Sequence, residues 1–441
     1  MIKEQLNINQ FIFDLENKYD LYNWVIDDIY VWELIRAEVY IKAQEYLSGE
    51  SFGKEISVPL FRKMNGLISR LFESFTKRNI FLICSKPDVF IFESGRKYLV
   101  DNNYVDMYSY FIAQKHLSNN ETVISIETNY NNDSIYNKSC KSFNNDSIKI
   151  LSRLFSLFFF IQLSSRDLEL IKKLEEDLIN ILGFPVKLFD LIKKNIKKFV
   201  GEKRSYELLL RIYSPKVIYY VNYLEYPALI EVAKRKGIKT IELQHGLIIK
   251  EALFYHFPNV NNNKLRYFSD EFYCWKDFKF NSGLLPLSKN QIILNDYNHL
   301  KYMKEKYSEI KKNDKAILIA SQPFKSLKIL TFILHNAPKM QDFVFYYKVH
   351  PMESNTFFLS EESRRLQELD NVIIYDNNVS AYELLSMSSY TLGIYSTLLF
   401  EAHYFGSIPM MLVDDSVFSE SLINNSSCIS IEPTIELKVQ I

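Results

Sequence analysis

The chain has 441 residues, with 53 basic and 53 acidic side chains, so its formal net charge is zero. Glycine is scarce: there are 11, where an average usage of roughly 7% would give about 31. This scarcity excludes collagen-like, glycine-rich linker and low-complexity classes. The balanced charge gives no general attraction to nucleic acid, and a chain of this length is expected to form two or three domains.

Cysteine spacing and apolar runs indicate the compartment. The four cysteines lie far apart, and the first twenty residues carry acidic side chains where a signal peptide needs an apolar run. The longest apolar stretch, residues 154–163, is about half as long as a membrane span. We therefore expect a cytoplasmic protein with reduced cysteines. The protein would either be dissolved in the cytoplasm or be bound peripherally to the inner face of the cytoplasmic membrane.

Residues 1–75 are predicted to be mostly helical. Residues 27–47 carry apolar side chains at helical spacing over five turns, and this helix is expected to end near Gly49. Short β-type runs with one intervening helix follow, at 80–84, 88–92, 105–116 (the helix) and 122–127. Residues 129–147 are rich in Asn and Ser and are predicted to form an exposed loop.

Residues 150–212 are predicted to be helical, with a basic face. Lys193, Lys194, Lys197 and Lys198 lie opposite leucine and isoleucine side chains. An ordinary amphipathic helix with a solvated face explains this pattern. The sharper alternative is a patch that touches anionic lipid, with the apolar run 154–163 in the membrane interface.

From residue 216 onward, buried strands alternate with helices. A strand at 216–222, a helix closed by Gly237 and a strand from 239 form a βαβ unit. Further strands are predicted at 316–321, 343–351, 372–376, 390–394 and 409–413. Such alternation predicts parallel, doubly wound sheets. The expected fold class is α/β, with two Rossmann-like domains facing a central cleft and extra N-terminal helices.

Residues that follow the strands of a parallel sheet are candidates for ligand binding, because ligands bind at the carboxyl ends of the strands. Lys348, His350 and Pro351 follow one strand of the second half. The imidazole can donate to a phosphate oxygen, the lysine adds charge, and the proline restricts the backbone. A histidine satisfied by the backbone is the plainer alternative.

Ser396 and Thr397 lie at a strand-to-helix junction in the same half. Two hydroxyls and the first N–H groups of a helix make an anion site. Glu401, one and a half turns further on, is near enough to receive a sugar hydroxyl. An ordinary helix cap is again the plainer alternative.

Glu242, Gln244 and His245 follow a strand of the first half. Glu242 and Gln244 share one face of that strand, and His245 takes the other. His245 is a candidate general base or acceptor ligand, and His256 is a candidate to line the same site. A buried, satisfied histidine is the competing interpretation.

A weaker cluster follows the strand at 88–92. Glu93 and Arg96 come directly after it, and Asp106 lies downstream. These residues could bind an acceptor or supply a carboxylate base, and they could equally form a polar loop.

Several well-known motifs are absent from the sequence. It contains no G-x-G-x-x-G, no P-loop motif, no H-E-x-x-H, no Cys/His cluster and no G-x-S-x-G. A dinucleotide cofactor and a metal ion are therefore not expected. A phosphate site without a metal motif fits a nucleotide-activated donor.

The motif Lys348-x-His350-Pro351 and the segment 382–412 resemble the nucleotide-binding half of GT-B glycosyltransferases of bacterial surface polysaccharides. The pattern is similar to the His-Pro and Ser-Ser/Thr motifs of bacterial sialyltransferases and polysialyltransferases, Kdo transferases of capsule assembly and CDP-glycerol glycerophosphotransferases. Residues 227–248 resemble the end of the N-terminal domain in capsule biosynthesis proteins of this group. The resemblance covers roughly residues 215–413.

The resemblance implies a metal-independent glycosyltransferase without a cofactor. It implies that His350, Ser396 and Thr397 hold the donor phosphate, that Pro351 fixes the loop, and that Glu401 lies near the ribose or the base. A base from the first Rossmann-like domain would remove the acceptor proton. The candidates for that base are His245, Glu242, Glu93 and Asp106, and those for acceptor binding are Arg96, Gln244 and His256.

The expected domains are a helical segment (1–75), an acceptor domain (76–270, with a helical insertion at about 150–212) and a nucleotide-sugar donor domain (271–441). The expected reaction moves a sugar, with a CMP-linked sialic-acid-like sugar or Kdo favoured, to a hydroxyl of a lipid-linked or growing surface polysaccharide. Nucleic acid is not an expected partner. The alternatives are a nucleotide-sugar 2-epimerase-like enzyme and a non-catalytic scaffold of polysaccharide assembly.

Overall fold

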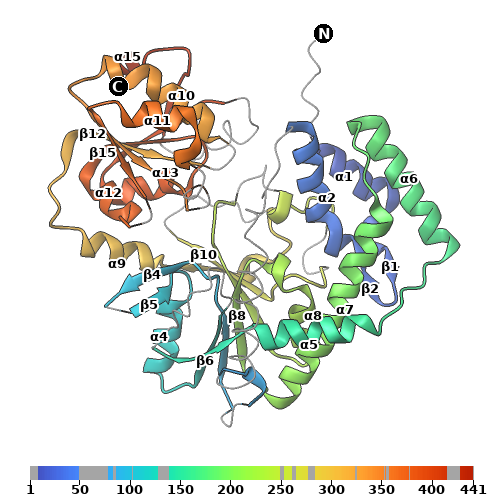
Figure 1. The fold of residues 1–441 in the computed structure, drawn as a ribbon. Coiled ribbons are helices and arrows are strands. Elements are labelled where there is room, and N and C mark those ends of the chain that lie inside the picture. Colours follow the sequence, from blue (N-terminus) through green and yellow to red (C-terminus); the bar gives the residue numbers. More distant parts are fainter. Residues whose placement is uncertain are drawn as a thin grey trace. The chain divides into compact units, whose positions relative to one another are not determined.

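The computed structural model describes residues 8–48, 78–82, 86–101, 103–127, 139–248, 253–260, 265–276, 284–322, 325–351, 353, 357–376, 378–414 and 428–440 (Figure 1). The chain divides into two compact units. The first unit comprises Met1–His245, Ala252–Trp275 and Ser282–Asn295. The second unit comprises Gly246–Glu251, Lys276–Asn281 and Asp296–Ile441.

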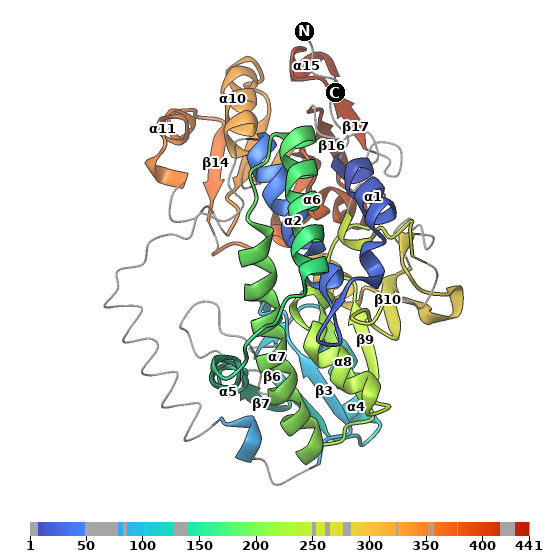
Figure 2. The same cartoon turned by 90° about the vertical axis from the view of Figure 1, so that its right-hand side faces the viewer.

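The first unit begins with a layer of helices. Its members are α1 (Ile8–Tyr19), α2 (Val31–Ser48), α5 (Asp146–Leu157), α6 (Ser165–Leu182) and α7 (Leu188–Ile212). Helices α2, α5 and α6 all contact α7, the longest of them (Figure 2). A short hairpin, β1 (Val25–Ile26) with β2 (Ile29–Tyr30), connects α1 to α2. The helix predicted at 27–47 is present but begins only at Val31, because residues 25–30 form the hairpin. Helices α5, α6 and α7 fill most of the predicted helical segment 150–212, and residues 49–75 lie outside the described residues.

Helices α5 and α7 approach each other closely at Gly201. A Cβ atom on Gly201 would lie 2.2 Å from the carbonyl oxygen of Ser152, so only glycine fits there. The Ser152 hydroxyl also donates to Ser205 Oγ at 3.0 Å across the same contact. This contact explains one of the few glycines of the chain.

A seven-stranded parallel sheet forms the centre of the first unit, in the order β11-β10-β9-β8-β3-β6-β7. Its strands are β3 (Val89–Phe92), β6 (Val123–Glu127), β7 (Lys141–Asn144), β8 (Val217–Val221), β9 (Lys239–Leu243), β10 (Glu271–Trp275) and β11 (Ile292–Asn295). The chain builds the sheet outward from β3 in one direction and then, from β8, in the other. The sheet therefore has a topological switch point between β3 and β8.

Alternate residues of these strands face two different layers. Ile91 of β3 packs with Ile112 of α4 (Tyr110–Ser118) on one face. On the other face, the ring of Phe92 contacts the ring of Tyr206 in α7 at 6.0 Å between centroids. Helix α8 (Pro227–Arg235) connects β8 to β9 and ends before Gly237, whose positive φ of 67° confirms the predicted cap.

Three further expectations for the first unit differ from the structure. Ile80–Leu82, predicted as a strand, is a 3-10 turn, and the helix predicted at 105–116 begins only at Tyr110. The residues before it form β5 (Asn103–Asp106), which pairs with β4 (Lys97–Val100) as a hairpin. Within the predicted loop 129–147, the described part forms β7 and the start of α5, because pairing with β6 supplies hydrogen bonds that local composition does not reveal.

The second unit contains a six-stranded parallel sheet in the order β14-β13-β12-β15-β16-β17. Its strands are β12 (Asn313–Ala320), β13 (Val344–Lys348), β14 (Val372–Tyr375), β15 (Ser388–Gly393), β16 (Ile408–Leu412) and β17 (Ile429–Ile431). Its helices are α9 (Asn298–Lys306), α10 (Ser326–Asn336), α11 (Glu361–Gln367), α12 (Ala381–Met387), α13 (Thr397–Ala402) and α15 (Leu437–Gln440). The switch point of this sheet lies between β12 and β15.

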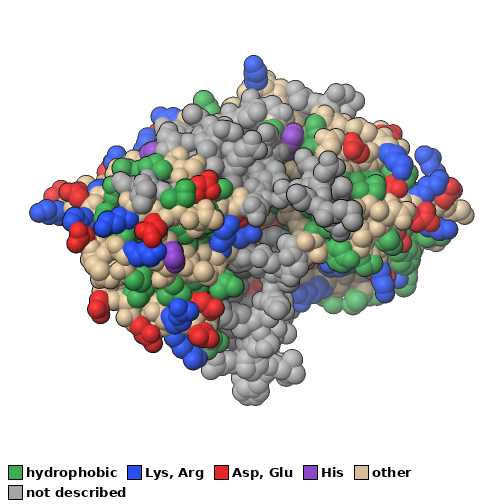
Figure 3. Space-filling model, turned by 90° about the horizontal axis from the view of Figure 1, so that it is seen from above, with side chains coloured by type: hydrophobic (Ala, Val, Ile, Leu, Met, Phe, Trp, Pro, Cys, Tyr) green, Lys and Arg blue, Asp and Glu red, His purple; other side chains and the backbone are tan. Residues whose placement is uncertain are grey.

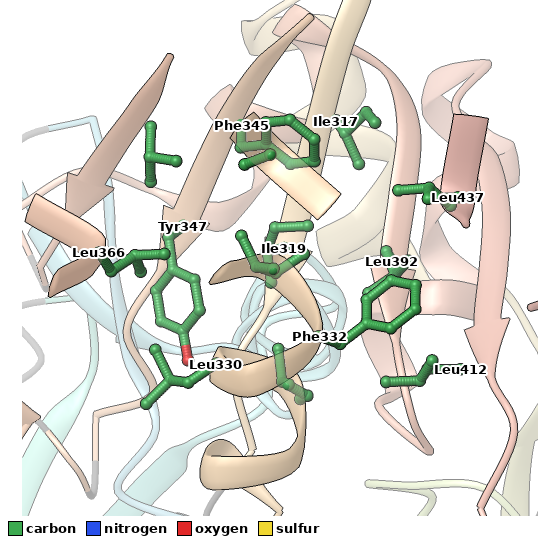
Figure 4. Packing of buried hydrophobic residues seen from close by; sticks show 14 of the residues in the cluster. Ile317, Ile319, Leu330, Phe332, Phe345, Tyr347, Leu366, Leu392, Leu412 and Leu437 are labelled. Atoms are coloured by element: carbon green, nitrogen blue, oxygen red, sulfur yellow. The ribbon is translucent and has the colours of Figure 1, made fainter. Parts of the chain in front are cut away.

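Figure 4 shows the core of the second unit on one face of its sheet. Ile319 of β12, Phe345 of β13 and Leu392 of β15 pack together there with Phe332 of α10, and all four are buried. Burying each such side chain contributes roughly 1.5–3 kcal/mol, so this face contributes much of the stability of the unit.

Each sheet has the strand order 3-2-1-4-5-6 of a Rossmann fold, with one more strand at the edge in the first unit. The predicted fold class, two Rossmann-like α/β units with extra N-terminal helices, is confirmed. The division between the units falls after Asn295 instead of residue 270, because β10 and β11 are hydrogen-bonded into the first sheet.

Charged side chains of both signs are interspersed on the face seen in Figure 3, in agreement with the balanced composition. Among the residues that the structure describes, no helix is both long enough and apolar enough to cross a membrane.

Candidate functional site

The switch point of the second unit brings two strand ends together. Ser321 and Gln322 follow β12, and the chain from Ile394 onward follows β15. The side-chain oxygen of Gln322 accepts the backbone N–H groups of Ile394 at 3.0 Å and Tyr395 at 2.8 Å. These two bonds fasten the turn after β15 to the end of β12.

Ser396 is the N-cap of α13, as predicted. Its hydroxyl oxygen accepts the N–H of Leu398 at 3.3 Å, and Thr397 is the first helical residue. Both side chains are half-buried. The first turn of a helix has N–H groups without an intrahelical partner, so this turn can offer donors to an anion.

The His350 turn is tied to the same strand end. His350 is half-buried beyond the end of β13, and its carbonyl accepts the N–H of Glu353 at 2.8 Å. The carboxylate of Glu353 in turn accepts the Ser321 hydroxyl at 2.5 Å. Because β12 lies between β13 and β15, His350, Gln322 and Ser396 follow three neighbouring strands of one sheet. The exposed Pro351 lies in the same turn.

Two residues predicted for this site make other contacts within the second unit. The Lys348 ammonium donates to the carbonyls of Asp376 at 2.5 Å and Val349 at 3.3 Å, and burial lowers its pKa. It joins the ends of β13 and β14. Glu401 is buried, and its Oε1 accepts the hydroxyl of Tyr297 at 3.2 Å and lies 3.5 Å from that of Tyr382. Glu401 was predicted to contact a ligand, but its carboxylate points toward α12 and the start of α9.

The sequence-based search missed Ser321, Gln322 and Glu353. Ser321 ends the predicted strand 316–321, and Gln322 follows it. The rule that ligands bind at strand ends could therefore have identified both residues. Glu353 had no such signal, since only its contact with Ser321 links it to the strand end.

In the first unit, two buried glutamates lie at the ends of neighbouring strands. Glu93 follows β3, Glu127 ends β6, and the Lys97 ammonium contacts the carboxylate of Glu127 and lies 3.5 Å from that of Glu93. The Ser125 hydroxyl donates to Glu93 at 2.5 Å. Burial, followed by the negative charges of Glu127 and Asp106, raises the pKa of Glu93 to about 8. The surroundings of Glu93 therefore favour its protonated form.

Asp106 holds the turn that follows β3. Its two oxygens accept the N–H groups of Ser94, Tyr108 and Ser109 and the hydroxyls of both serines, at 2.5–3.1 Å. Five donors occupy the acceptor positions of this carboxylate. Asp106 was predicted as a base, but in the structure it stabilises the backbone of this turn. The short segment before α4 directs its N–H groups back at the carboxylate.

Arg96 and His245, predicted from separate segments, lie in one group. Arg96 donates to the hydroxyl of Tyr108 at 2.9 Å, and that hydroxyl donates to the His245 carbonyl at 3.0 Å. The ring of Tyr108 stacks on Trp275 at 6.5 Å, and the N–H of Trp275 donates to Gln244 Oε1 at 2.8 Å. Arg96, Gln244 and His245 are thus brought together at the ends of β9 and β10.

The imidazole of His245 is neutral at physiological pH. Burial, followed by the positive charge of Arg96, lowers the pKa of His245 to about 4. A neutral imidazole can accept a proton, although a low pKa makes it a weak base. Tyr108, which connects Arg96 to His245, was not predicted, because no spacing rule links it to the end of β9.

Glu242 and His256 lie elsewhere in the first unit. Glu242 is fully buried, and its Oε1 accepts the hydroxyl of Tyr255 at 2.6 Å and the N–H of Tyr223 at 3.1 Å. The ring of His256 packs edge-on against Phe13 of α1 at 5.1 Å. Glu242 was predicted from its place at the end of a strand, but its side chain lies in the aromatic core. His256 was predicted from its closeness to His245 along the chain, but it packs against the helical layer.

The buried carboxyl of Glu242 should make the stability of the first unit depend on pH. Burial raises its pKa to about 8, from about 4.5 for an exposed glutamate, so the folded chain keeps the proton longer than the unfolded chain does. The stabilisation this gives is complete below pH 4.5 and is lost as the pH rises toward 8. Glu242→Gln keeps the acceptor oxygen but does not titrate. From pH 5 to 8 the variant should gain stability relative to wild type by at most roughly 1.4 kcal/mol per pH unit.

The measurement is urea unfolding at several pH values, followed by tryptophan fluorescence. All three tryptophans, Trp24, Trp32 and Trp275, lie in the first unit, so the signal reports on the unit that contains Glu242. A constant difference between variant and wild type across this range would contradict the buried, protonated state of Glu242.

Among the described residues, no group of three or more His, Cys, Asp or Glu side chains could hold a metal ion.

Comparison with known proteins adds a set of distant structural resemblances. No protein-family model and no curated protein matches the chain in sequence. A UDP-GlcNAc 2-epimerase from Methanocaldococcus jannaschii has a TM-score of 0.47 and 12% identity, covering 78% of this chain and 89% of that chain. The glycotransferase of kitacinnamycin has a TM-score of 0.47 and 11% identity, with 80% and 88% covered. CalG4, the calicheamicin glycosyltransferase, has a TM-score of 0.44 and 10% identity, with 79% and 86% covered. We infer no activity from resemblances at this level.

Proposed function

We propose that the chain is a glycosyltransferase that binds a nucleotide-activated sugar at the switch point of its second unit. The observation that carries this proposal is the convergence of His350, Gln322 and Ser396 at three neighbouring strand ends, with the first turn of α13 beside them. Ligands of open parallel sheets bind at such a switch point. Hydroxyls, N–H groups and an imidazole are donors suited to phosphate oxygens.

In this proposal, the second unit stabilises the leaving group. Displacement at the anomeric carbon by an acceptor hydroxyl breaks the bond to the donor phosphate, and negative charge builds up on the phosphate oxygens. His350, the hydroxyls of Ser396 and Thr397 and the N–H groups of α13 would stabilise that charge as preorganised donors.

In the first unit, His245 is the proposed acceptor of the hydroxyl proton, with Arg96 and Gln244 as ligands of the acceptor. The neutral state of the imidazole supports this role, and Arg96 is exposed and able to meet a polar substrate. Glu93 is the second candidate for this base. It ranks below His245 because a protonated carboxyl must lose its own proton before it can accept one.

The finer details rest on the sequence resemblance alone. We propose a CMP-linked sialic-acid-like sugar or Kdo as the donor and a lipid-linked or growing surface polysaccharide, such as a capsule, as the acceptor. Neither a metal ion nor a cofactor is part of the proposed reaction.

Product analysis separates this proposal from its alternatives. The chain is incubated with nucleotide sugars, with and without an oligosaccharide acceptor, and the products are identified by mass spectrometry and NMR. A transferase gives an elongated acceptor and a free nucleotide only when acceptor is present. Conversion of the nucleotide sugar without acceptor would identify an epimerase, and no conversion of any kind would support a scaffold.

We further propose that the end of α5 touches anionic lipid. Phe158 and Phe160 are 76% and 80% exposed, and Leu154 and Leu157 beside them are also exposed. The Lys197 ammonium lies 6.0 Å from the centre of the Phe160 ring, so positive charge borders this apolar ridge. Exposed aromatic side chains next to lysines suit an anionic membrane interface.

A vesicle-binding experiment tests the lipid contact. Phe158→Ser with Phe160→Ser should weaken binding to phosphatidylglycerol vesicles at least about tenfold, because each buried phenylalanine contributes roughly 1.5–3 kcal/mol. Leu359→Ser, at a side chain of the second unit that is 70% exposed, is the control and should bind like wild type. Equal binding by wild type and the double variant would contradict the proposal.

A further inference from the structure

Gln322 occupies the central position of the switch point in the second unit. It directly follows Ser321 at the end of β12, and it is 7% exposed. Its Oε1 accepts two backbone N–H groups of the turn after β15, from Ile394 and Tyr395. Its own hydrogen bonds therefore hold the Gln322 side chain in place.

These two hydrogen bonds determine where the NH2 group of Gln322 points. A carbonyl oxygen has two lone pairs, and two N–H donors occupy both. Reversing the amide would place its NH2 group against two other N–H groups, which is strongly unfavourable. Nε2 must therefore point away from the turn after β15.

Nε2 makes no hydrogen bond with any part of the chain that the structure describes. An amide N–H without a partner in the chain is a donor that a bound ligand can use. The neighbouring Ser321 has no hydroxyl proton to offer a ligand, because its hydroxyl already donates to Glu353 and accepts from Tyr347. Gln322 is thus the residue at the end of β12 with an unused donor.

We propose that Gln322 Nε2 donates a hydrogen bond to a phosphate oxygen of the bound nucleotide. The same side chain positions the turn that precedes Ser396 through its oxygen and contacts the ligand through its nitrogen. This assignment rests on the proposed function of the second unit. It adds a binding residue outside the His-Pro and Ser/Thr motifs, and it requires the ligand to carry an acceptor oxygen at this point.

Gln322→Glu separates the two roles. A carboxylate oxygen can still accept the N–H groups of Ile394 and Tyr395, so the turn after β15 keeps its anchor. The variant loses the donor and gains a negative charge where the phosphate binds. We expect the variant to fold, with a melting temperature lowered by the cost of burying its carboxylate. Its affinity for CMP or CDP, whichever binds wild type more tightly, should be at least about tenfold weaker. Affinity for cytidine, which lacks the phosphate, should change far less.

Gln341→Glu is the matched control. It makes the same change of charge in the same unit but before β13, at the opposite edge of the sheet, where Gln341 donates only to the Pro338 carbonyl at 3.1 Å. This variant should bind the nucleotide like wild type. An equal loss in both variants would show an effect of net charge and would overturn the assignment.

Gln322→Met provides a second test that does not depend on added charge. It should weaken nucleotide binding more than cytidine binding, whereas equal losses for the two ligands would overturn the assignment. Nucleotide binding by Gln322→Glu at wild-type affinity would overturn it as well and leave the proposed function in place. A wild-type chain that binds none of CMP, CDP, UDP and GDP would overturn the proposed function and the assignment with it.

Discussion

Replacing His350 with alanine is expected to reduce turnover about a hundredfold and to leave the fold intact. The imidazole is half-buried beyond β13, in a turn held by the backbone bond from Glu353 and by the contact of Glu353 with Ser321. Both of these contacts remain when the imidazole is removed. Losing one preorganised donor to developing negative charge typically costs a factor of about 10²–10³ in turnover.

His335→Ala is the matched control for this experiment. His335 is an exposed residue of α10 in the same unit, and its ring contacts only the Lys339 ammonium at 2.9 Å among the hydrogen-bond partners described. Initial rates are measured for both variants at saturating donor, together with melting temperatures. Wild-type turnover by His350→Ala would contradict the placement of the donor phosphate.

Replacing Arg36 with methionine is expected to destabilise the first unit by about 3–5 kcal/mol. Arg36 is buried in α2, where its Nε lies 2.6 Å from the carboxylate of Glu16 in α1. It also donates to the carbonyls of Leu253 at 2.5 Å and His256 at 2.8 Å. Removing one partner of a buried ion pair leaves the other charge uncompensated, which costs about that much.

A double variant tests the reason for this loss. Glu16→Gln with Arg36→Met keeps an amide oxygen for the indole of Trp32 and removes the uncompensated charge. It should recover part of the lost free energy of unfolding in urea, measured by tryptophan fluorescence. Lys18→Met, which removes an exposed ion pair of α1 with Asp177, should change stability little. A loss for Arg36→Met no larger than that for Lys18→Met would contradict the buried ion pair.

The architecture could be predicted largely from the sequence, because strands of a parallel sheet are apolar throughout and alternate with helices. The segment 316–413 shows this pattern plainly, and its strands β12 to β16 form as expected. The pattern failed where pairing between distant segments decides the structure. Strand β7 is polar and half-exposed, and it exists because β6 offers it an edge.

The candidate sites could be predicted only in part, for a related reason. Strand ends locate residues along the chain, and this rule correctly brought His350 and Ser396 to one edge of a sheet. The rule could not show which of these side chains make hydrogen bonds within the protein instead of facing a ligand. Glu242 accepts a buried hydrogen bond and Lys348 donates to the end of the neighbouring strand, whereas Gln322 is identified only by the two N–H groups that its oxygen accepts.

The most direct test of the proposed nucleotide site is a thermal-shift panel with CMP, CDP, UDP and GDP compounds and their sugar conjugates. A ligand at a hundred times its Kd stabilises the folded state by about 2.7 kcal/mol, which corresponds to a shift of a few degrees. We expect at least one compound, with cytidine nucleotides favoured, to raise the melting temperature and His350→Ala to reduce that shift. If no compound of the panel raises the melting temperature of the wild-type chain, the second unit does not bind a nucleotide and the proposed glycosyltransferase function is wrong.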